Sequence, residues 1–338
     1  MNTEYAKLPP LDPSRTATIE AFGARIAALE PIEAEESGID LAAETAPPRD
    51  VLDALEMEMA QRGFMVFRNE AEIGHEAFLR ASRWWGGREL HSPHGVHPAT
   101  PDGNPHIFRL SNDRRHGIPD VGPQWHNDGS FIPATFSHSG YHIIRPPERG
   151  GGTHFAHQGI AHDALPEETR ERWARLSSVN SASGVVHPMV HTHPLTGCRC
   201  IWLHLGMTGA IIEKLPEAEG FRLLDADEMT EVCHTYNDIL NAGLENGYAT
   251  TFEYRQNDCV FIDNLAVAHR AAPEAHMPVE QQGLRIMHRS TTRGTHPLVP
   301  GFGLPQHVEI DGGNPFGSGV WQGGGIGFRW EEGIPMRN

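Results

Sequence analysis

From residue 139 onward the chain is a succession of short segments with strand character, and these constrain the fold more than any other feature. They are rich in β-branched and aromatic residues and are bounded by Gly, Pro, Asn and Asp. Many short strands separated by turns are typical of double-sheet and barrel folds. The sequence therefore predicts a mainly β fold with an all-β double-sheet core and flanking helices. The expected strands cover 139–144, 153–156, 185–190, 199–203, 249–254, 259–262, 266–269 and 284–291.

A few helices are expected around this core. Residues 49–62 carry apolar side chains at three- and four-residue spacing, and Gly63 ends this helix before a short buried strand over 64–67. Residues 1–48 are interpreted as a lead-in with one helix, residues 49–294 as one domain, and residues 295–338 as a Gly- and Pro-rich extension packed on that domain. Further helices are expected over 18–29, 76–85, 163–176 and 227–240.

The balance of charge limits the partners of the protein. The chain has 27 Lys and Arg against 44 Asp and Glu, a net charge of −17, without a Lys- or Arg-rich tract. We expect neither nucleic acid nor membrane as a partner, whereas local Arg residues could still hold a small anionic substrate. The aromatic residues of the tail could close a pocket or pack against a second subunit, so a homo-oligomer is left open.

The N-terminus and the cysteines point to a cellular compartment. The first residues lack an apolar leader, and the chain has no apolar run long enough to span a bilayer. The sequence therefore favours a cytoplasmic protein. The four cysteines are too few for a disulfide scaffold, and we interpret them as free thiols in a reducing compartment.

The stretch Gln124–Phe131 holds a candidate pair of metal ligands. His126 and Asp128 are two residues apart, and on a strand such residues point to the same face. They could offer one imidazole nitrogen and one carboxylate oxygen to a single ion. Two His and one carboxylate form the facial triad of non-haem Fe(II) oxygenases, so the pair calls for a third ligand.

A candidate third ligand follows the turn pair Asp263-Asn264. A second short strand after this turn carries His269 into an apolar setting. Alone, His269 would be a core histidine bonded to a backbone carbonyl. It becomes a candidate ligand only together with His126 and Asp128.

The strand expected over 284–291 carries two arginines on one face. Arg285 and Arg289 alternate with apolar residues and with His288, so both arginines face the core or both face solvent. An inward arginine needs a compensating anion and would hold a carboxylate through two parallel N–H bonds. Outward arginines would form surface ion pairs, and the local sequence leaves both arrangements open.

Five motifs in order resemble those of the taurine dioxygenase family of iron(II)/2-oxoglutarate-dependent oxygenases, which also contains aryloxyacetate dioxygenases. The resemblance covers roughly residues 50–294. The motifs are Trp125-His126-x-Asp128, Pro146-Pro147 to Thr153-x-Phe155, His187-Pro188 to Thr196-Gly197, Asp263-Asn264 to Ala271, and Arg285 to Arg289.

This resemblance implies a double-stranded β-helix, a jelly-roll or cupin-like core. It implies that His126, Asp128 and His269 bind Fe(II), and that Thr153 and Arg285 hold the distal carboxylate of 2-oxoglutarate. The reaction would be the hydroxylation of a small, anionic organic substrate by O2, with release of succinate and CO2.

The resemblance also implies where the substrate binds. Arg289 lies where taurine-type members hold the anionic group of the substrate, and His91 or His94 resembles a substrate-contacting His. Gly122-Pro123 stands where the taurine enzymes carry an Asn, and Ile262 stands where a Trp is usual. These departures point away from taurine itself.

Two alternatives stay open at the level of sequence. The same site could desaturate, cyclise or epoxidise its substrate, because the outcome depends on how the substrate is placed. A jelly-roll protein could also bind a divalent metal without redox chemistry, although such a protein has no use for a carboxylate clamp. A second metal site at His187, His191 and His193 is disfavoured, because two of the three precede Pro and fit a turn.

Overall fold

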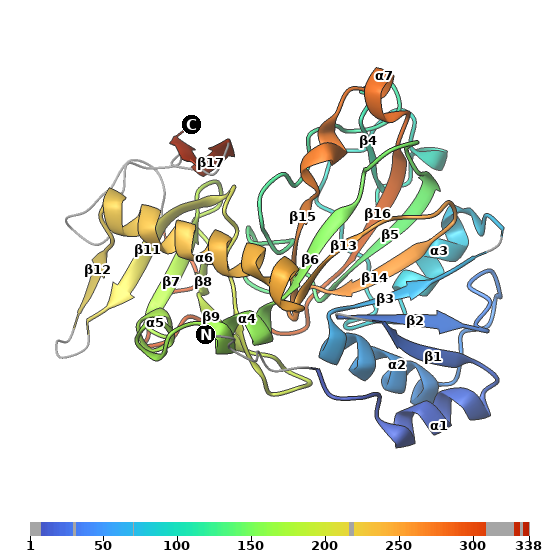
Figure 1. Ribbon diagram of the computed structural model, residues 1–338, viewed down its shortest axis with the longest axis horizontal. Helices are drawn as coiled ribbons and strands as arrows, with labels where there is room; N and C mark the ends of the chain where they lie inside the picture. The colour runs from blue at the N-terminus through green and yellow to red at the C-terminus, as the bar shows by residue number, and fades with distance from the viewer. Residues whose placement is uncertain are drawn as a thin grey trace.

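A computed structural model describes residues 8–29, 32–69, 71–215 and 220–308, together with the backbone alone of 328–331 and 334–337. Figure 1 shows a large sheet with helices α1 to α3 at one end of the molecule and a smaller sheet at the other. The long helix α6 (Ala226–Asn246) extends from the smaller sheet toward the larger one.

The larger sheet has seven strands, and its neighbouring pairs are antiparallel except for β2 and β3, which run parallel. Its strands β3, β5, β14 and β16 match strands predicted from the sequence. In order across the sheet they are β1 (Arg25–Leu29), β2 (Glu33–Ser37), β3 (Phe64–Phe67), β14 (Cys259–Asp263), β5 (His138–Arg145), β16 (Ile286–Thr292) and β4 (Phe108–Ser111).

A three-stranded antiparallel sheet faces the larger one across a buried apolar cluster. It consists of β13 (Ala249–Phe252), β6 (Thr153–His157) and β15 (Val267–Ala271). The rings of Phe64 and Phe155, one from each sheet, have centroids 4.5 Å apart, and Val260 and Val267 are fully buried in the same cluster. Two sheets around one apolar core confirm the mainly β prediction.

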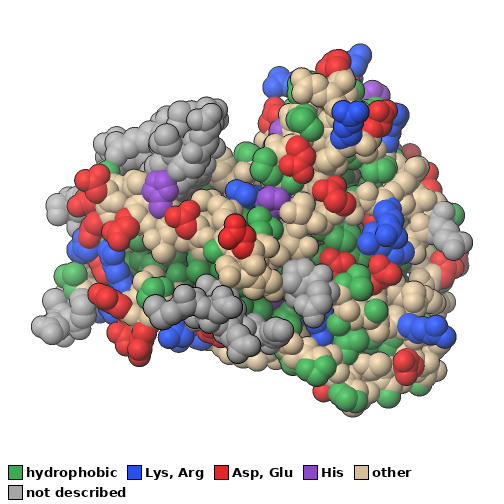
Figure 2. Space-filling view, viewed as in Figure 1, with side chains coloured by type: hydrophobic (Ala, Val, Ile, Leu, Met, Phe, Trp, Pro, Cys, Tyr) green, Lys and Arg blue, Asp and Glu red, His purple; other side chains and the backbone are tan. Residues whose placement is uncertain are grey.

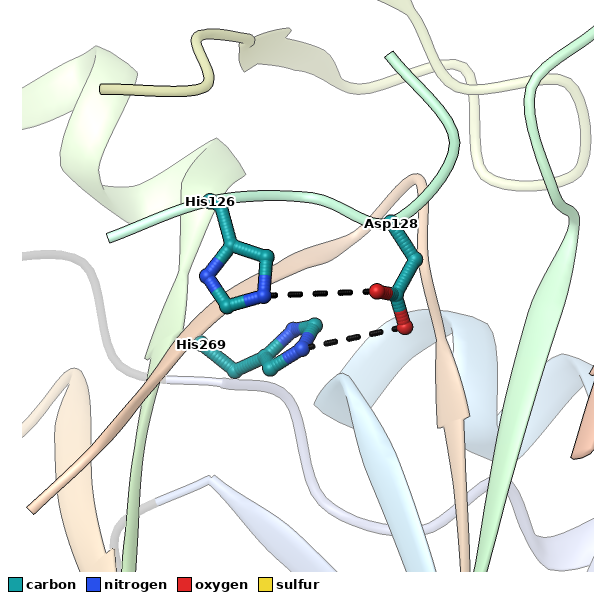
Figure 3. A group of neighbouring side chains, drawn as sticks. All are labelled: His126, Asp128 and His269. Carbon is teal, nitrogen blue, oxygen red and sulfur yellow. Dashed lines mark ion pairs between the residues drawn. The ribbon is translucent and has the colours of Figure 1, made fainter. Parts of the chain in front are cut away.

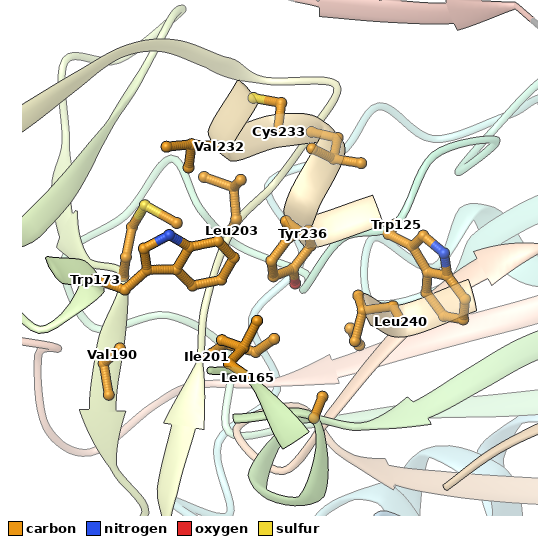
Figure 4. Close-up of a cluster of buried hydrophobic side chains, with 14 of the residues drawn as sticks. Trp125, Leu165, Trp173, Val190, Ile201, Leu203, Val232, Cys233, Tyr236 and Leu240 are labelled. Atoms are coloured by element: carbon orange, nitrogen blue, oxygen red, sulfur yellow. The ribbon is translucent and has the colours of Figure 1, made fainter. Parts of the chain in front are cut away.

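A second core lies under α6. The helix begins with a capping box between Asp225 and Glu228 and ends at Gly247, which has a left-handed backbone conformation. Its buried face packs on the smaller sheet, which has four strands, and on α4 (Gln158–Ala164) and α5 (Glu167–Trp173) (Figure 4). Trp125 joins this core and donates from Nε1 to Oδ1 of Asn241 at 2.9 Å, which anchors the chain immediately before His126.

The predicted helix over 49–62 is confirmed as α2 (Arg49–Arg62), which packs with α1 (Pro13–Ala21) and α3 (Gly74–Ser82) against the larger sheet. Gly63 ends α2 with φ +98°, and a Cβ there would lie 3.1 Å from Cβ of Val267. A glycine therefore allows the chain to turn sharply from α2 into β3 close to β15.

The prediction for the N-terminal segment is wrong. A helix was expected over 18–29, but α1 ends at Ala21 and residues 25–29 form β1. The hairpin of β1 and β2 belongs to the larger sheet, so the described part of this segment is not a separate lead-in. The Ala- and Glu-rich sequence of this hairpin favours helix locally, and pairing of β2 with β3 overrides that preference.

The single helix expected over 163–176 is also wrong. The chain forms two helices, α4 (Gln158–Ala164) and α5 (Glu167–Trp173), with Pro166 as the N-cap residue of the second. The proline ring and its missing N–H favour the start of a helix over its interior. Three strands of the four-stranded sheet were not predicted: β7 (Leu176–Asn180), β11 (Thr208–Lys214) and β12 (Phe221–Leu223).

The remaining elements complete the chain. The four-stranded sheet has the order β12 (Phe221–Leu223), β11 (Thr208–Lys214), β7 (Leu176–Asn180) and β8 (Val186–Pro188). The others are β9 (Val190–Thr192), β10 (Arg199–Ile201), α7 (Val279–Gln282), the 3-10 helices η1 (Pro101–Gly103) and η2 (Pro273–His276), β17 (Phe328–Glu331) and β18 (Ile334–Arg337).

The C-terminal segment is described only in part. Leu304 and Val308 pack against the buried cluster of the four-stranded sheet. Residues 309–327, which carry most of the glycines of the predicted extension, lie outside the described residues. The proposed packing of the whole extension on the domain therefore stays a prediction.

Two observations concern the surface. Figure 2 shows acidic and basic side chains interspersed on the face that it draws, without an extended basic patch among the described residues there.

In the described part of the chain, every helix is too short or too polar to cross a membrane.

Candidate metal centre and anion-binding cavity

Three of the predicted residues converge between the two facing sheets. The ligand atoms of His126, Asp128 and His269 lie within 4.8 Å of one another, and all three residues are buried (Figure 3). Nε2 of His126 is 4.0 Å from Oδ1 of Asp128, and Nε2 of His269 is 3.8 Å from Oδ2. The described residues contain no other group of three or more such ligands.

The way in which His126 and Asp128 meet differs from the prediction. They do not share one face of a regular strand, because Gly129 turns the chain with φ +86° directly after Asp128. His126 instead forms an isolated bridge with His269, in which each backbone N–H donates to the other residue's carbonyl, at 3.0 and 2.9 Å. The two imidazoles are therefore placed by the main chain.

The hydrogen bond of His126 sets its tautomer. Nδ1 lies 2.7 Å from the carbonyl oxygen of Gln124, and only a protonated nitrogen can donate to that oxygen. The lone pair is then on Nε2, which faces Asp128. Burial lowers the pKa of His126 and of His269, so both rings are neutral and able to bind a cation.

Asp128 is held as a carboxylate. Oδ2 accepts from the hydroxyl of Ser139 at 2.7 Å, and Oδ1 accepts from Nη1 of Arg289 at 2.6 Å. Burial would raise the pKa of Asp128, but the charge of Arg289 and the two imidazoles outweigh it and hold the pKa below the usual range. An ionised carboxylate is what a metal ligand requires.

A buried amide network fixes the turn that carries these ligands. Nδ2 of Asn127 donates to the carbonyl oxygens of Asn264 and Val267 at 2.7 and 3.0 Å. Asn264 in return accepts from the N–H of Asp128 and donates to its carbonyl oxygen, both at 2.8 Å. The turn Asp263-Asn264, for which no role at the metal site was predicted from the sequence, thus positions Asp128.

Next to the triad is a cavity whose wall carries both predicted arginines. Arg285 and Arg289 line it with Met287, so the inward arrangement of this strand is confirmed. Nε of Arg285 is buried and has no hydrogen-bond partner among the described residues. The other lining residues are Leu110, Ile118, Val121, Gly122, His126, Tyr141, Thr153, His269 and Ala271.

Thr153 faces the same cavity. Its Oγ1 accepts a hydrogen bond of 2.8 Å from the hydroxyl of Tyr254. Because that lone pair is occupied, the hydroxyl proton of Thr153 remains available to an acceptor in the cavity. A guanidinium with an unpartnered nitrogen and a hydroxyl with a free proton are suited to binding a carboxylate.

Of the two candidate substrate histidines, the structure brings one to the site. Nε2 of His94 is 2.6 Å from Nη2 of Arg289, and the ring stacks on Phe108 at 4.3 Å. Burial, with the charge of Arg289, lowers the pKa of His94 to about 4, so its ring is neutral. His91 is directed elsewhere, since its Nδ1 lies 3.0 Å from Nη2 of Arg293.

Three residues near the triad were not predicted. The hydroxyl of Tyr141 is 3.0 Å from Nε2 of His269, Ser139 bonds Asp128, and the ring of His204 is 5.0 Å from that of His126. Ser139 and Tyr141 are two residues apart on β5, so alternation along the strand could have placed both on the inner face. No comparable signal marks His204.

Two of the three histidines that were disfavoured as a second metal site have hydrogen-bond partners, whereas neither ring nitrogen of His191 has one among the described residues. Nε2 of His187 lies 3.1 Å from the carbonyl oxygen of Ser130, and Nε2 of His193 lies 3.1 Å from Oδ2 of Asp263. They pack within the fold rather than around a common point.

Comparisons with known proteins agree with this geometry. The model of the family "Taurine catabolism dioxygenase TauD, TfdA family" matches residues 25–291. An alpha-ketoglutarate-dependent sulfonate dioxygenase of Saccharomyces cerevisiae is 23% identical over 69% of this chain and 60% of its own length. An alpha-ketoglutarate-dependent sulfate ester dioxygenase of Pseudomonas putida is 25% identical over 60% of this chain and 69% of its own. The chain thus spans less than two thirds of the yeast protein.

Solved structures share the fold. A taurine dioxygenase from Burkholderia xenovorans superposes with a TM-score of 0.64 at 21% identity, over 81% of this chain and 92% of that one. At this identity the likeness establishes the fold alone, and it confirms the predicted jelly-roll.

Proposed function

Because the chain belongs to the TauD, TfdA family, we propose that it is an Fe(II)- and 2-oxoglutarate-dependent dioxygenase that hydroxylates a small anionic organic substrate. The single observation that carries this proposal is the cavity in which a His-Asp-His triad adjoins Arg285 and Thr153. The triad alone fits several divalent metals, whereas the clamp calls for a carboxylate beside the metal.

The donor set suits Fe(II). Two neutral imidazoles and one carboxylate, with no thiolate among them, form the facial arrangement that non-haem iron oxygenases use. His126 presents a lone pair at Nε2, and Asp128 is ionised. The buried Nδ1 of His269 has no partner among the described residues, so no hydrogen bond at that nitrogen fixes the tautomer, and a metal at Nε2 would place the proton on Nδ1.

The clamp suits 2-oxoglutarate. Arg285 is charged and partly buried and has an unpartnered Nε, while Thr153 has a hydroxyl proton to donate. Together they would bind the carboxylate far from the metal, which orients the dicarboxylate along the cavity. When bound, iron, 2-oxoglutarate and O2 supply the oxidising power, and succinate and CO2 are released.

The remaining residues act on the substrate and on water. Leu110, Ile118, Val121 and Met287 give the cavity apolar walls, which exclude water from the site. Arg289, with His94 beside it, is the cation on which we propose an anionic group of the substrate docks. The relatives from yeast and Pseudomonas putida are named for sulfonates and sulfate esters, so these two classes are the first substrates to test.

The test begins with binding in the absence of O2. Addition of Fe(II) and 2-oxoglutarate to the protein should give a weak visible charge-transfer band. We expect Arg285→Ala to weaken 2-oxoglutarate binding by about 10- to 100-fold, the loss of one charge-assisted pair, with metal affinity retained. Arg293→Ala, at a partly exposed position outside the cavity, is the matched control.

Two outcomes would contradict the proposal. A wild-type protein that binds metal without the band is a metal-binding protein of another kind. An Arg285→Ala variant with unchanged 2-oxoglutarate affinity would remove the cosubstrate assignment while leaving the metal site intact. Succinate release with a panel of sulfonates, sulfate esters, carboxylates and aryloxyacetates would then identify the substrate, and product analysis would separate hydroxylation from desaturation, cyclisation or epoxidation.

A further inference from the structure

Among the described residues, Tyr141 places its hydroxyl next to the nitrogen of His269 that we expect to bind the metal. The residue lies on β5, is 4% exposed, and places its oxygen 3.0 Å from Nε2 of His269. The same nitrogen faces Asp128 at 3.8 Å and is therefore the atom that would bind the metal. Tyr141 and the metal compete for one position on His269.

The direction of this hydrogen bond depends on the tautomer of His269. A phenol keeps its proton at neutral pH, and a neutral imidazole has one lone pair and one N–H. Binding of a metal at Nε2 requires that the lone pair be there and the proton on Nδ1. In that tautomer the phenol of Tyr141 donates to Nε2.

A metal at Nε2 would remove the hydrogen-bond partner of the Tyr141 hydroxyl. The hydroxyl would then face a cavity whose side chains offer few hydrogen-bond acceptors. The cavity is lined by guanidinium groups, from Arg285 and Arg289, by apolar side chains such as Met287, and by the hydroxyl of Thr153, which already accepts a hydrogen bond from Tyr254. Both oxygens of Asp128 already accept hydrogen bonds. A buried donor without an acceptor is costly, so an anion that enters the cavity is its natural partner.

We propose that Tyr141 is a positioning residue with two partners: its hydroxyl hydrogen-bonds with Nε2 of His269 in the metal-free protein and donates to a carboxylate oxygen of 2-oxoglutarate in the metal-loaded protein. This inference rests on the proposed function. It assigns to one hydroxyl two opposite effects, because the phenol competes with the metal and then assists the cosubstrate.

Tyr141→Phe separates these effects. Without the hydroxyl, metal binding no longer breaks a hydrogen bond, so the affinity for Mn(II) should rise by about fivefold. The metal-loaded variant lacks a donor to an anion, so its affinity for 2-oxoglutarate should fall by about tenfold. Both affinities are measured by calorimetry on the full chain with Mn(II), without turnover.

Tyr248→Phe is the matched control. Its hydroxyl is also buried and donates to the carbonyl oxygen of Ile239 at 2.7 Å, on the helix α6 rather than in the cavity. Both variants should show the same small loss of thermal stability, and only Tyr141→Phe should change the two affinities in opposite directions.

The outcomes are distinguishable from failure of the proposed function. If the Mn(II)-loaded wild type does not bind 2-oxoglutarate, the proposed function fails. If the wild type binds it and Tyr141→Phe leaves both affinities unchanged, or lowers both together, the role of Tyr141 is overturned and the proposed function stands.

Discussion

Nη1 of Arg289 donates a 2.6 Å hydrogen bond to Oδ1 of Asp128, so the cation that we expect to hold a substrate is also paired with the carboxylate of the triad. Both side chains are buried, and the guanidinium carbon lies 4.8 Å from the centroid of the Phe108 ring. Arg289 therefore links the substrate side of the cavity to the metal side.

The substrate side of this link can be tested with Arg289→Ala. An anionic substrate should bind about 10- to 100-fold more weakly, because a charge-assisted pair is lost. The affinity for 2-oxoglutarate should change much less, since Arg285 and Thr153 are untouched. Binding is measured by titration of the most active compound of the panel. Equal losses for substrate and 2-oxoglutarate would show that Arg289 does not discriminate between them.

The metal side gives a prediction about pH. Burial raises the pKa of Asp128, and Arg289 is the largest influence that lowers it. In Arg289→Gln the folded-state pKa should rise, so protonation of Asp128 sets in at higher pH as the solution is acidified. The acid limb of Mn(II) binding should therefore move to higher pH than in the wild type. An unshifted limb would mean that Arg289 does not control the ionisation of Asp128.

A third prediction concerns the orientation of Thr153. Tyr254 donates to Oγ1 of Thr153, which leaves the threonine proton directed to the cavity. In Tyr254→Phe the threonine hydroxyl can rotate, so 2-oxoglutarate should bind roughly fivefold more weakly, about the worth of one neutral hydrogen bond. Calorimetry with the Mn(II)-loaded protein measures this. A double variant with Thr153→Val should lose no more than Thr153→Val alone, because Tyr254 acts through Thr153.

Because Gly122 has no side chain, we expect that it leaves the space that the imidazole of His126 needs. It has φ +70°, and a Cβ there would lie 2.8 Å from Cε1 of His126. Gly122→Ala should displace the imidazole and weaken metal binding by about tenfold or more. Gly103→Ala is the matched control, since Gly103 has φ +59° but nothing within 4 Å of an added Cβ. Similar metal affinities in the two variants would contradict the predicted displacement of His126.

Stability should depend steeply on pH below neutrality. Burial lowers the pKa values of six buried histidines far below 6.5, so between these values and 6.5 the unfolded chain binds more protons than the folded protein. Stability therefore falls as pH falls through this window, and we expect Tm to drop by about 10 °C or more between pH 7.5 and 5.5. The pKa falls to about 4 for His142, His154, His157, His187 and His191 and to about 3 for His288.

A single substitution checks the cause. His142 is fully buried beside Phe78, and neither ring nitrogen has a hydrogen-bond partner among the described residues. His142→Leu should make Tm less dependent on pH, while His296→Leu at an exposed position should leave the dependence unchanged. A wild-type Tm that is flat between pH 7.5 and 5.5 would contradict the prediction.

Patterns within short segments predicted much of this fold. The apolar spacing of 49–62 gave α2 with its bounds, and the alternation around Arg285 and Arg289 predicted two side chains that the structure places on one wall. The hairpin of β1 and β2 escaped prediction because its Ala and Glu residues favour helix, and only pairing with β3 makes it a strand.

The site residues that lie in sequence motifs could be predicted. Those that reach the site because segments distant in the sequence pack side by side could not. His126, Asp128 and His269 were found, but the choice between His91 and His94 depends on the path of an irregular loop that sequence does not specify. The role of Tyr141 depends on β5 lying opposite β15, a relationship between distant segments that local periodicity cannot express.

The backbone bridge between His126 and His269 means that the proposed metal site requires β15, which is synthesised long after Asp128. During synthesis the first imidazole and the carboxylate emerge long before β15, and they have no fixed geometry until β15 has paired with β6. It follows that a nascent or half-folded chain offers no complete site. Under the proposed function, oxidative chemistry could therefore begin only after this pairing has formed.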